Sequence, residues 1–414
     1  YGQAYDALKI RDYRFFIAAR LLLTIGWQMQ AVIFGWMIYA HTKDAMSLGL
    51  IGLAEAIPAI TIALFGGHLA DKYNRRKLIL FFLVMLLLVS IALTVFSLHP
   101  QENFYRFGTL PVYAMIFLTG IARGILGPTI SAFASQLVPK SLYASASAWS
   151  STVWQLGAVT GPALGGMVYG FYNAFYASVL VCGFIIATFF CYLLIGNKPV
   201  QVQQREISLF ESLTTGIRFV MKNQIMLSAI TLDLFAVLFG GAVALLPMFA
   251  DKVLGTGAEG LGLLRAAPAF GAVLMAFTLA HRPPVHNTGK KLLWSVAGFG
   301  CCIILFALST NFYFSLALLA LSGMLDSVSV IIRSTIMQTI TPDDMRGRVS
   351  AVNTIFIGSS NEIGAFESGL AAKLMGLVPS VVFGGTMTLL VVFLTSKLAL
   401  SLRKLHLTNL PATH

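Results

Sequence analysis

Long runs of predominantly apolar residues recur along the whole sequence and constrain its fold more than any other feature. A helix of about 20 such residues spans the hydrocarbon core of a bilayer. Because that core holds no water, a crossing backbone must satisfy its hydrogen bonds within a helix or a closed barrel. We therefore predict an all-α integral membrane protein of twelve transmembrane helices. The spans are expected near residues 14–40, 47–70, 77–98, 111–137, 144–170, 173–195, 225–250, 258–281, 289–308, 311–340, 346–373 and 378–401.

The composition excludes a soluble globular protein. Of the 414 residues, 57% are hydrophobic and 11% are charged, whereas soluble domains carry about 25% charged residues. The first apolar run is long enough to span and lacks a small-residue cleavage site, so we interpret it as a span rather than a signal peptide. The cysteines lie in apolar runs without metal-ligand spacing, and we expect no metal and no cofactor. They are Cys182, Cys191, Cys301 and Cys302.

An internal repeat divides the chain. Residues 52–59 (GLAEAIPA) resemble residues 262–269 (GLLRAAPA) at an offset of 210. At an offset of 203, Pro139, Ser147, Ala148 and Gly161 match Pro342, Ser350, Ala351 and Gly364. We predict six-helix halves at 1–196 and 223–414, joined by a cytoplasmic linker at 197–222 that contains an amphipathic helix. Halves repeated in this parallel sense are related by an axis along the membrane normal, with the substrate site between them.

Basic residues are distributed unevenly between the two sides of the predicted bundle. With the N-terminus in the cytoplasm, 20 of the 28 lysines and arginines lie in cytoplasmic segments, four lie outside and four lie within spans. The positive-inside rule therefore places both termini in the cytoplasm, and we expect a bacterial inner-membrane location. This distribution also accounts for the net charge of +12 without a nucleic-acid partner.

The loop after the second span, residues 67–77, reads GHLADKYNRRK. Gly67 allows two helices to approach closely. Asp71 can interact with the N-terminal dipole of a neighbouring helix, and Arg75 and Arg76 can bridge cytoplasmic helix ends. The alternative is a plain positively charged loop. The pattern resembles the signature loop of the major facilitator superfamily, which implies that these four residues form a cytoplasmic gate.

Two further motifs lie in the fourth and fifth spans. Arg123, followed by GILGP, resembles the buried arginine that the superfamily carries on its fourth helix. Residues 157–166 (GAVTGPALGG) resemble the motif shared by its proton-driven exporters. Glycines permit tight helix packing and proline bends a helix, although an ordinary packing face would use the same residues. The gating residues expected here are Gly157, Gly161, Pro162 and Gly165.

Within the superfamily, the sequence most resembles the branch that contains the enterobactin exporter and related drug transporters. Residues 242–268 and 342–349 carry much of this likeness. The second copy of the signature loop departs from the pattern, because residues 280–284 (AHRPP) place His281 where the first copy has Asp71. The resemblance implies a major facilitator fold, and the departure of the second loop predicts an asymmetric cytoplasmic latch.

Ionisable residues within the spans are the candidate functional groups. Each costs about 2.5–3.5 kcal/mol at a helix centre, so each requires a partner or a hydrated cavity. Two pairs change sign across the repeat. Glu55 corresponds to Arg265, which predicts a structural ion pair or a gate contact, and Arg123 corresponds to Asp326, which predicts charges facing a central cavity. The full set is Arg20, Glu55, Arg123, Asp233, Arg265, Asp326, Arg333, Glu362 and Glu367.

Three carboxylates of this set are the stronger candidates for proton carriers. Asp326 and Arg333 are seven residues apart on one helix face and can neutralise each other. No partner is close in sequence to the remaining acids, and an unpaired buried carboxylate holds its proton more readily. These acids are Asp233, Glu362 and Glu367.

Polar and aromatic groups of the first span complete the predicted substrate pathway. Trp27 and Gln28 offer an indole and an amide to a central cavity, unless the tryptophan faces lipid. Arg20 lies near the cytoplasmic end of the span, where its long side chain can extend to the interface.

These observations predict a secondary active transporter rather than an enzyme, since the sequence contains no Walker loop, nucleophile elbow or histidine-rich metal cluster. We expect proton-coupled export of a small amphipathic or anionic molecule, siderophore or drug-like, by alternating access. The alternatives are an importer of a siderophore or carboxylated nutrient on the same fold, and a lipid flippase. The expected partners are the substrate, protons and membrane lipid, and we expect a monomer.

Overall fold

The computed structural model describes residues 6–197, 209–281, 287–342 and 345–405. The side chains of residues 63–72, 140, 144, 209–213 and 280–281, and of several residues between 346 and 359, lie outside this description. Every regular element in the described ranges is a helix, as the apolar runs predict. The fold class expected from the sequence is therefore confirmed.

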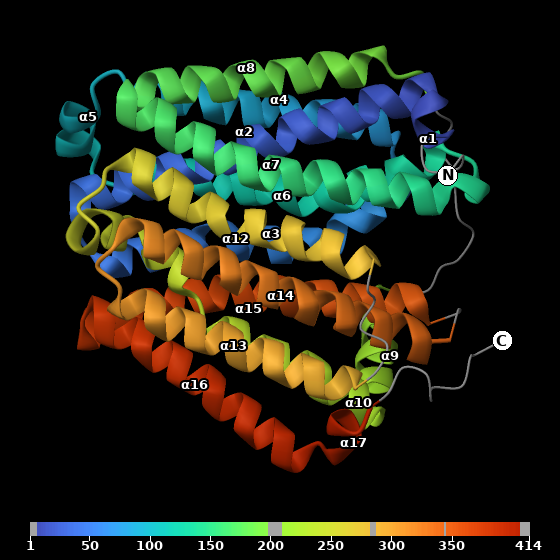
Figure 1. Ribbon diagram of the computed structural model, residues 1–414. Helices are drawn as coiled ribbons and strands as arrows, with labels where there is room; N and C mark the ends of the chain where they lie inside the picture. The colour runs from blue at the N-terminus through green and yellow to red at the C-terminus, as the bar shows by residue number, and fades with distance from the viewer. Residues whose placement is uncertain (1–5, 198–208, 282–286, 343–344, 406–414) are drawn as a thin grey trace. The chain divides into compact units, whose positions relative to one another are not determined.

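The chain divides into two compact units (Figure 1). Unit 1 comprises residues 1–43, 53–204 and 255–266, and unit 2 comprises residues 44–52, 205–254 and 267–414. Two long helices contribute to both units. They are α3 (Ala45–Lys72) and α12 (Ala258–His281).

Unit 1 is a bundle in which α2 packs along α7 and α8, while α4 packs against α6 and α8 (Figure 1). Its remaining elements are α1 (Asp6–Lys9), α2 (Arg11–Thr42), α4 (Arg75–Phe96), α5 (Pro100–Phe107), α6 (Leu110–Leu137), a 3₁₀ turn at Lys140–Leu142, α7 (Tyr143–Phe171) and α8 (Ala174–Leu194).

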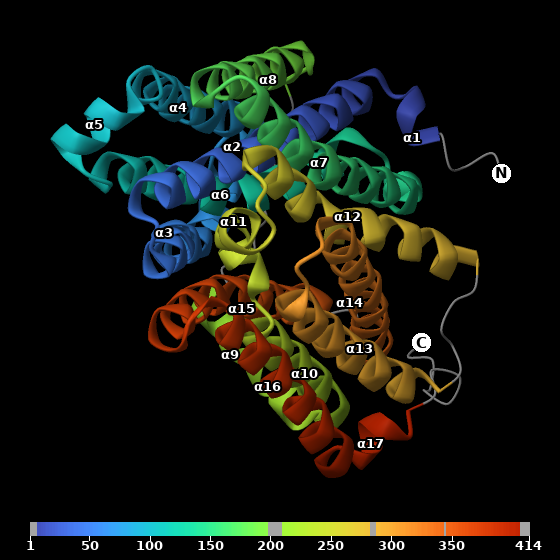
Figure 2. The same cartoon turned by 60° about the vertical axis from the view of Figure 1, so that its left-hand side comes forward.

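Unit 2 is a second bundle, in which α13 lies against α14 and α16, and α10 against α15 and α16 (Figure 2). Its core includes the fully buried Met226, Leu292, Ile332 and Ile336. The elements are α9 (Leu209–Lys222), α10 (Gln224–Phe239), a 3₁₀ turn (Ala242–Leu245), α11 (Leu246–Met248), a π-helical turn (Phe249–Val253), α13 (Thr288–Leu308), α14 (Phe312–Ile340), α15 (Arg346–Met375), α16 (Leu377–Leu398) and α17 (Leu400–Arg403).

Ten helical segments in the described part of the chain are long and apolar enough to cross a membrane. The other two expected spans correspond to α7 and α15, which have 29 and 30 residues but carry more polar side chains. The seventh span is interrupted, because α10 ends at Phe239 and the chain continues to Val253 through short turns. The described helices are thus compatible with twelve spans.

Asparagine side chains begin several of these helices. Asn74, Asn173, Asn223 and Asn311 each accept a hydrogen bond from the backbone N–H three residues later, at 3.0–3.1 Å. Such a cap satisfies one of the free N–H groups of the first turn and stabilises a helix by about 1 kcal/mol. The starts of α4, α8, α10 and α14 are therefore encoded locally.

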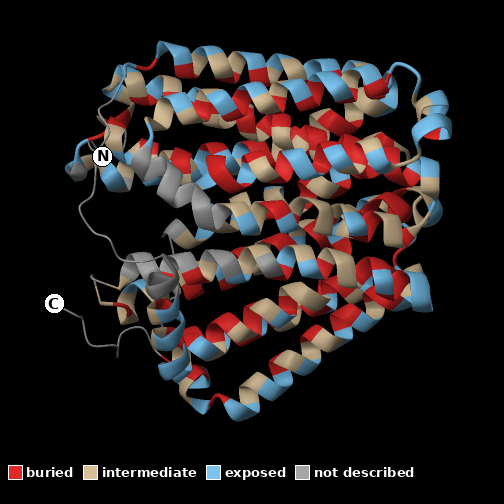
Figure 3. Cartoon of the chain, turned by 180° about the vertical axis from the view of Figure 1, so that it is seen from behind, coloured by how far each residue is buried: buried red, intermediate tan, exposed pale blue. Residues whose placement is uncertain are grey.

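Large apolar side chains are exposed on the outer helices of both units. Figure 3 shows exposed residues interleaved with buried ones around the helices. On α4, Phe81, Leu88 and Val95 are 66%, 61% and 58% exposed, and on α16 Leu398 is 76% exposed. Apolar surface of this extent is unfavourable in water and indicates contact with lipid.

The internal repeat is visible in two glycine contacts of the same kind. A Cβ built on Gly52 of α3 would lie 2.9 Å from Ala365 Cβ of α15, in unit 2. A Cβ on Gly262 of α12 would lie 2.5 Å from the Pro162 oxygen of α7, in unit 1. The two pairs are related by the sequence offsets of 210 and 203. Equivalent helices therefore cross at equivalent glycines, which permit close approach.

Candidate functional site

A buried ion pair joins two helices of unit 2. Arg333 Nη1 on α14 lies 2.5 Å from Asp233 Oδ2 on α10, and the two side chains are only 5% and 7% exposed. Asp233 has no partner close in sequence, but it is paired, so the prediction of an unpaired carboxylate at this position is wrong. The partner lies on a helix distant in sequence, and the packing of α10 on α14 brings the two charges together.

Asp326 completes this group of charges. It precedes Arg333 by two turns on α14 and interacts electrostatically with both Arg333 and Asp233. With all three residues ionised, the Asp233–Arg333–Asp326 cluster carries two negative charges and one positive charge. An uncompensated charge away from water is costly, so binding of one proton would neutralise the cluster and stabilise it.

A second ion pair lies in unit 1 and is more accessible. Arg123 Nη1 on α6 is 2.9 Å from Glu55 Oε1 on α3, and the two side chains are 51% and 20% exposed. The guanidinium carbon of Arg123 also lies 6.0 Å from the centroid of the Trp27 ring on α2. A cation at this distance is attracted by the face of an indole.

The expected pairing of Glu55 with Arg265 is corrected by this geometry, because the carboxylate bonds to Arg123 instead. The physical reason is the crossing of α6 and α3 at Gly120. A Cβ on this glycine would overlap the backbone oxygen of Glu55, so the two helices are in direct contact there. Arg123, one turn further along α6, then reaches the carboxylate. That Arg123 and Asp326 both face a central cavity stays a prediction.

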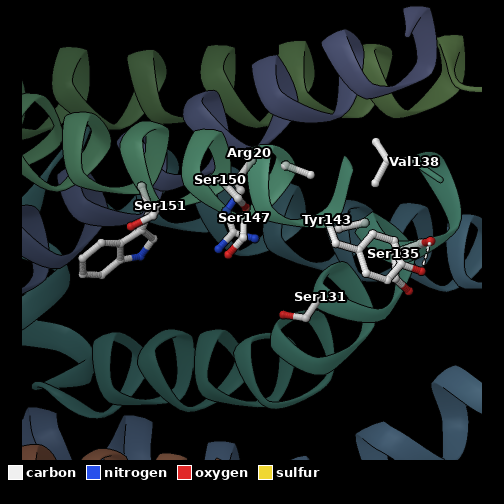
Figure 4. A pocket seen from close by; sticks show the side chains of 11 residues that line it. Arg20, Ser131, Ser135, Val138, Tyr143, Ser147, Ser150 and Ser151 are labelled. Atoms are coloured by element: carbon white, nitrogen blue, oxygen red, sulfur yellow. Dashed lines mark hydrogen bonds between the residues drawn. The ribbon is translucent and has the colours of Figure 1, made fainter. Parts of the chain in front are cut away.

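A cavity of about 490 Å³ lies between α2, α6 and α7 in unit 1 (Figure 4). Hydroxyl groups make up much of its wall, and the Tyr143 hydroxyl donates to the Ser135 carbonyl at 3.1 Å. The lining residues are Arg20, Ser131, Ala134, Ser135, Val138, Tyr143, Ala146, Ser147, Ser150, Ser151 and Trp154.

Arg20 is the one charged side chain among the described residues that line this cavity. Its Nε is buried and has no hydrogen-bond partner in the described part of the chain. The groups that interact with it electrostatically there are the phenols of Tyr192 and Tyr13, and the Tyr13 hydroxyl donates to the Ala146 carbonyl at 2.6 Å. Arg20 thus contributes to a cavity wall, in addition to any contact with the membrane interface.

The arginines of the signature loop tie helix ends of unit 1 together. Arg75 Nη1 donates to the Ala132 carbonyl on α6 at 2.9 Å. Arg76 donates from Nε to the Tyr192 carbonyl at 3.0 Å and from Nη2 to the Leu193 carbonyl at 2.6 Å, both on α8. Cations stabilise the C-terminal ends of helices in this way. Gly67 and the side chain of Asp71 lie in the part of α3 whose side chains are not described.

The glycines of α7 pack against α2, where an added Cβ would meet another atom at 3.0 Å or less. The nearest atoms are Thr24 Cγ2 for Gly157, Gln28 Cβ for Gly161 and Met29 Cα for Gly165, at 2.6, 2.6 and 3.0 Å. Gly166 faces α12, with the Ala258 oxygen 2.5 Å from its added Cβ. The motif in span 5 is therefore a helix-contact stripe, and Pro162 lies within it.

The remaining predicted residues lie in several places. Glu362, on α15, lies where this helix contacts α3, and its Oε2 is 3.3 Å from the Cβ built on Gly52. Glu367 is partly buried on α15. Gln28 contacts the α7 glycine stripe through its Cβ, and Arg265 is partly buried on α12.

The sequence analysis did not identify the cavity of unit 1 as a site. The signal lies in the spacing of polar residues within apolar spans. Ser147, Ser151 and Trp154 follow one another at intervals of four and three residues, and Ser131 and Ser135 are four apart. Residues at such intervals share one face of a helix. Two serine-bearing faces beside a span arginine would have indicated a polar cavity.

Comparisons with known proteins agree with this architecture. A sequence profile of the Major Facilitator Superfamily matches residues 16–365. The enterobactin exporter EntS of Shigella boydii serotype 18 is 26% identical over 392 residues, which cover 95% of this chain and 92% of that protein. EntS of Escherichia coli O1:K1 shows the same identity and coverage.

Solved structures show the same fold. A bacterial homologue of the human lysosomal transporter Spinster, in an inward-facing conformation, superposes with a TM-score of 0.73 at 14% identity and covers 95% of this chain and 98% of its own. A bacterial homologue of the iron transporter ferroportin gives a TM-score of 0.69 at 15% identity, covering 95% and 99%. The chain therefore belongs to the major facilitator superfamily and is a multi-pass membrane transporter rather than an enzyme.

Proposed function

We propose that this transporter is a proton-coupled exporter of a small amphipathic or anionic molecule, of the siderophore or drug-like class, in a bacterial inner membrane. The observation that carries the proton coupling is the Asp233–Arg333–Asp326 cluster. The Arg333 guanidinium forms an ion pair with the buried Asp233 and interacts electrostatically with Asp326. Such a cluster is neutral with one bound proton and negatively charged without it, so proton binding can favour one conformation over another.

The proposed direction of transport and the substrate class are supported by other observations. The curated relatives that cover most of the chain are enterobactin exporters. The glycine stripe of α7 resembles the motif of proton-driven exporters, and it contacts both α2 and α12. Glycines allow the backbones of neighbouring helices to approach closely.

The test uses purified protein in liposomes and radiolabelled enterobactin as the first substrate. With the lumen acidic, outward proton flow should drive enterobactin into the lumen, and a protonophore should abolish this uptake. Asp326→Asn and Asp233→Asn should lose gradient-driven uptake but retain exchange of labelled for unlabelled substrate, since exchange needs no net proton movement.

Glu102→Gln is the matched control, because Glu102 is an exposed carboxylate on α5 outside the cluster. It should behave as the unmodified protein does. Uptake that is indifferent to the pH gradient, or that keeps its gradient dependence in both aspartate variants, would exclude proton coupling through this cluster. Uptake driven by a gradient of the opposite sense would indicate an importer.

A further inference from the structure

The cavity of unit 1 contains polar groups that proton coupling in unit 2 does not use. Its wall combines one guanidinium, from Arg20, with the hydroxyls of serines on α6 and α7. Figure 4 shows Arg20, Ser147 and Ser150 on one side of the cavity, with Ser131 on the other side. Arginine and hydroxyl groups are hydrogen-bond donors, so this wall is suited to an acceptor-rich, negatively charged group.

The charge of Arg20 is not balanced by a carboxylate in the described residues. Its Nε has no acceptor there, and the hydroxyl of Tyr192, which interacts with it electrostatically, is also buried without a partner. Arg20 is partly buried, and a cation that is removed from water in part without a counter-ion is unfavourable. The fold does not require an arginine at this position. At the repeat offset of 210 residues, the equivalent position of unit 2 is occupied by the buried Ile230.

The size and the apolar part of the cavity set the class of ligand. Its volume of about 490 Å³ lies within the range of about 300–1,000 Å³ that is typical of small-molecule sites. Trp154, Val138 and Ala146 add apolar and aromatic surface to the wall. A molecule with an anionic group and an aromatic body would therefore match both parts.

We propose that this cavity binds the anionic group of the transported molecule, with Arg20 as its counter-ion and the hydroxyls of Ser147 and Ser150 as further donors. The ligand class is an aromatic carboxylate or phenolate. This inference rests on the proposed transport function, but it assigns substrate recognition to Arg20, on α2, rather than to Arg123, which is paired with Glu55.

The test compares two probes of nearly the same size and shape, one anionic and one neutral. The anion 1-naphthoate and its neutral analogue 1-naphthamide are titrated into the purified protein in detergent, at fixed pH and without a gradient, by isothermal titration calorimetry. Naphthoate should bind about tenfold more tightly than naphthamide, as expected for a charge-assisted hydrogen bond. Arg20→Gln should abolish this difference, and Arg20→Lys should retain part of it.

Arg14→Gln is the matched control, since Arg14 is an exposed arginine on the same helix and does not line the cavity. It should leave both affinities unchanged. If Arg20→Gln does not yield a monodisperse protein, the Ser147→Ala/Ser150→Ala variant serves instead and should weaken naphthoate binding several-fold. Equal binding of the two probes, or a naphthoate preference that survives loss of Arg20 or of both serines, would overturn the inference.

The phosphate of a lipid headgroup is the alternative anionic ligand for this cavity. Phosphatidylglycerol added to the detergent solution should not displace naphthoate if the cavity takes substrate. Displacement that Arg20→Gln removes would reassign the cavity to anionic lipid. Asp326→Asn should leave naphthoate binding intact, so failure of proton coupling and failure of this site give different results.

Discussion

At the scale of single residues, the buried charges of unit 2 depend on one another. Arg333→Gln would leave Asp233 and Asp326 without their cation in the protein interior. Breaking a buried pair by removing one partner costs on the order of 3–5 kcal/mol, whereas removing both partners costs less. We expect Arg333→Gln to lower the Tm in detergent more than the double variant Asp233→Asn/Arg333→Gln does.

The single variant Asp233→Asn provides the third corner of this double-mutant cycle. If the decrease in Tm of the double variant equals the sum of the decreases of the two single variants, the charges act independently. It would also remove the physical basis of the shared proton. Differential scanning fluorimetry on all four proteins, in one detergent and at one pH, makes the comparison direct.

At the scale of elements, the close approach of α7 to α2 depends on the absence of side chains. A Cβ on Gly161 would lie 2.6 Å from Gln28 Cβ and 2.9 Å from the Ile25 oxygen. Gly161→Val must separate the helices, and overpacking of this kind costs about 1–3 kcal/mol. We expect a lower Tm and reduced transport, measured on the same preparation in detergent and in liposomes.

Gly183→Val is the matched control on α8, because nothing lies within 4 Å of a Cβ built on Gly183. It should change the Tm little, apart from the small effect of replacing glycine in a helix. If the two valine variants lose the same stability, the effect belongs to the glycine replacement itself and not to the contact between α7 and α2.

At the scale of the whole molecule, the distribution of basic residues predicts the orientation in the membrane. We expect both termini in the cytoplasm and the connection that carries α5 on the outer side. In a variant without the four native cysteines, Glu102→Cys should react with a membrane-impermeant thiol reagent in intact cells. Lys9→Cys should react only after the cells are opened. The reverse pattern would show that the orientation is inverted.

The sequence alone determined the all-helical membrane fold and the repeat. A run of about 20 apolar residues has one stable solution in lipid, a helix that satisfies its own backbone hydrogen bonds. Local signals also specify details, such as the asparagine caps that begin α4 and α8. The glycines of residues 157–166 predicted a helix contact, and the structure shows α2 and α12 on the other side of it.

The partners of the buried charges were decided only by the tertiary structure. Opposite charges at repeat-related positions favoured a Glu55–Arg265 pair. Because α6 and α3 cross at Gly120, Glu55 forms an ion pair with Arg123 instead. Asp233, without a partner close in sequence, pairs with Arg333 on α14. Coulomb attraction acts through distances of a few ångströms, and these distances are set by which helices pack together and at what height, which spacing along the chain does not encode.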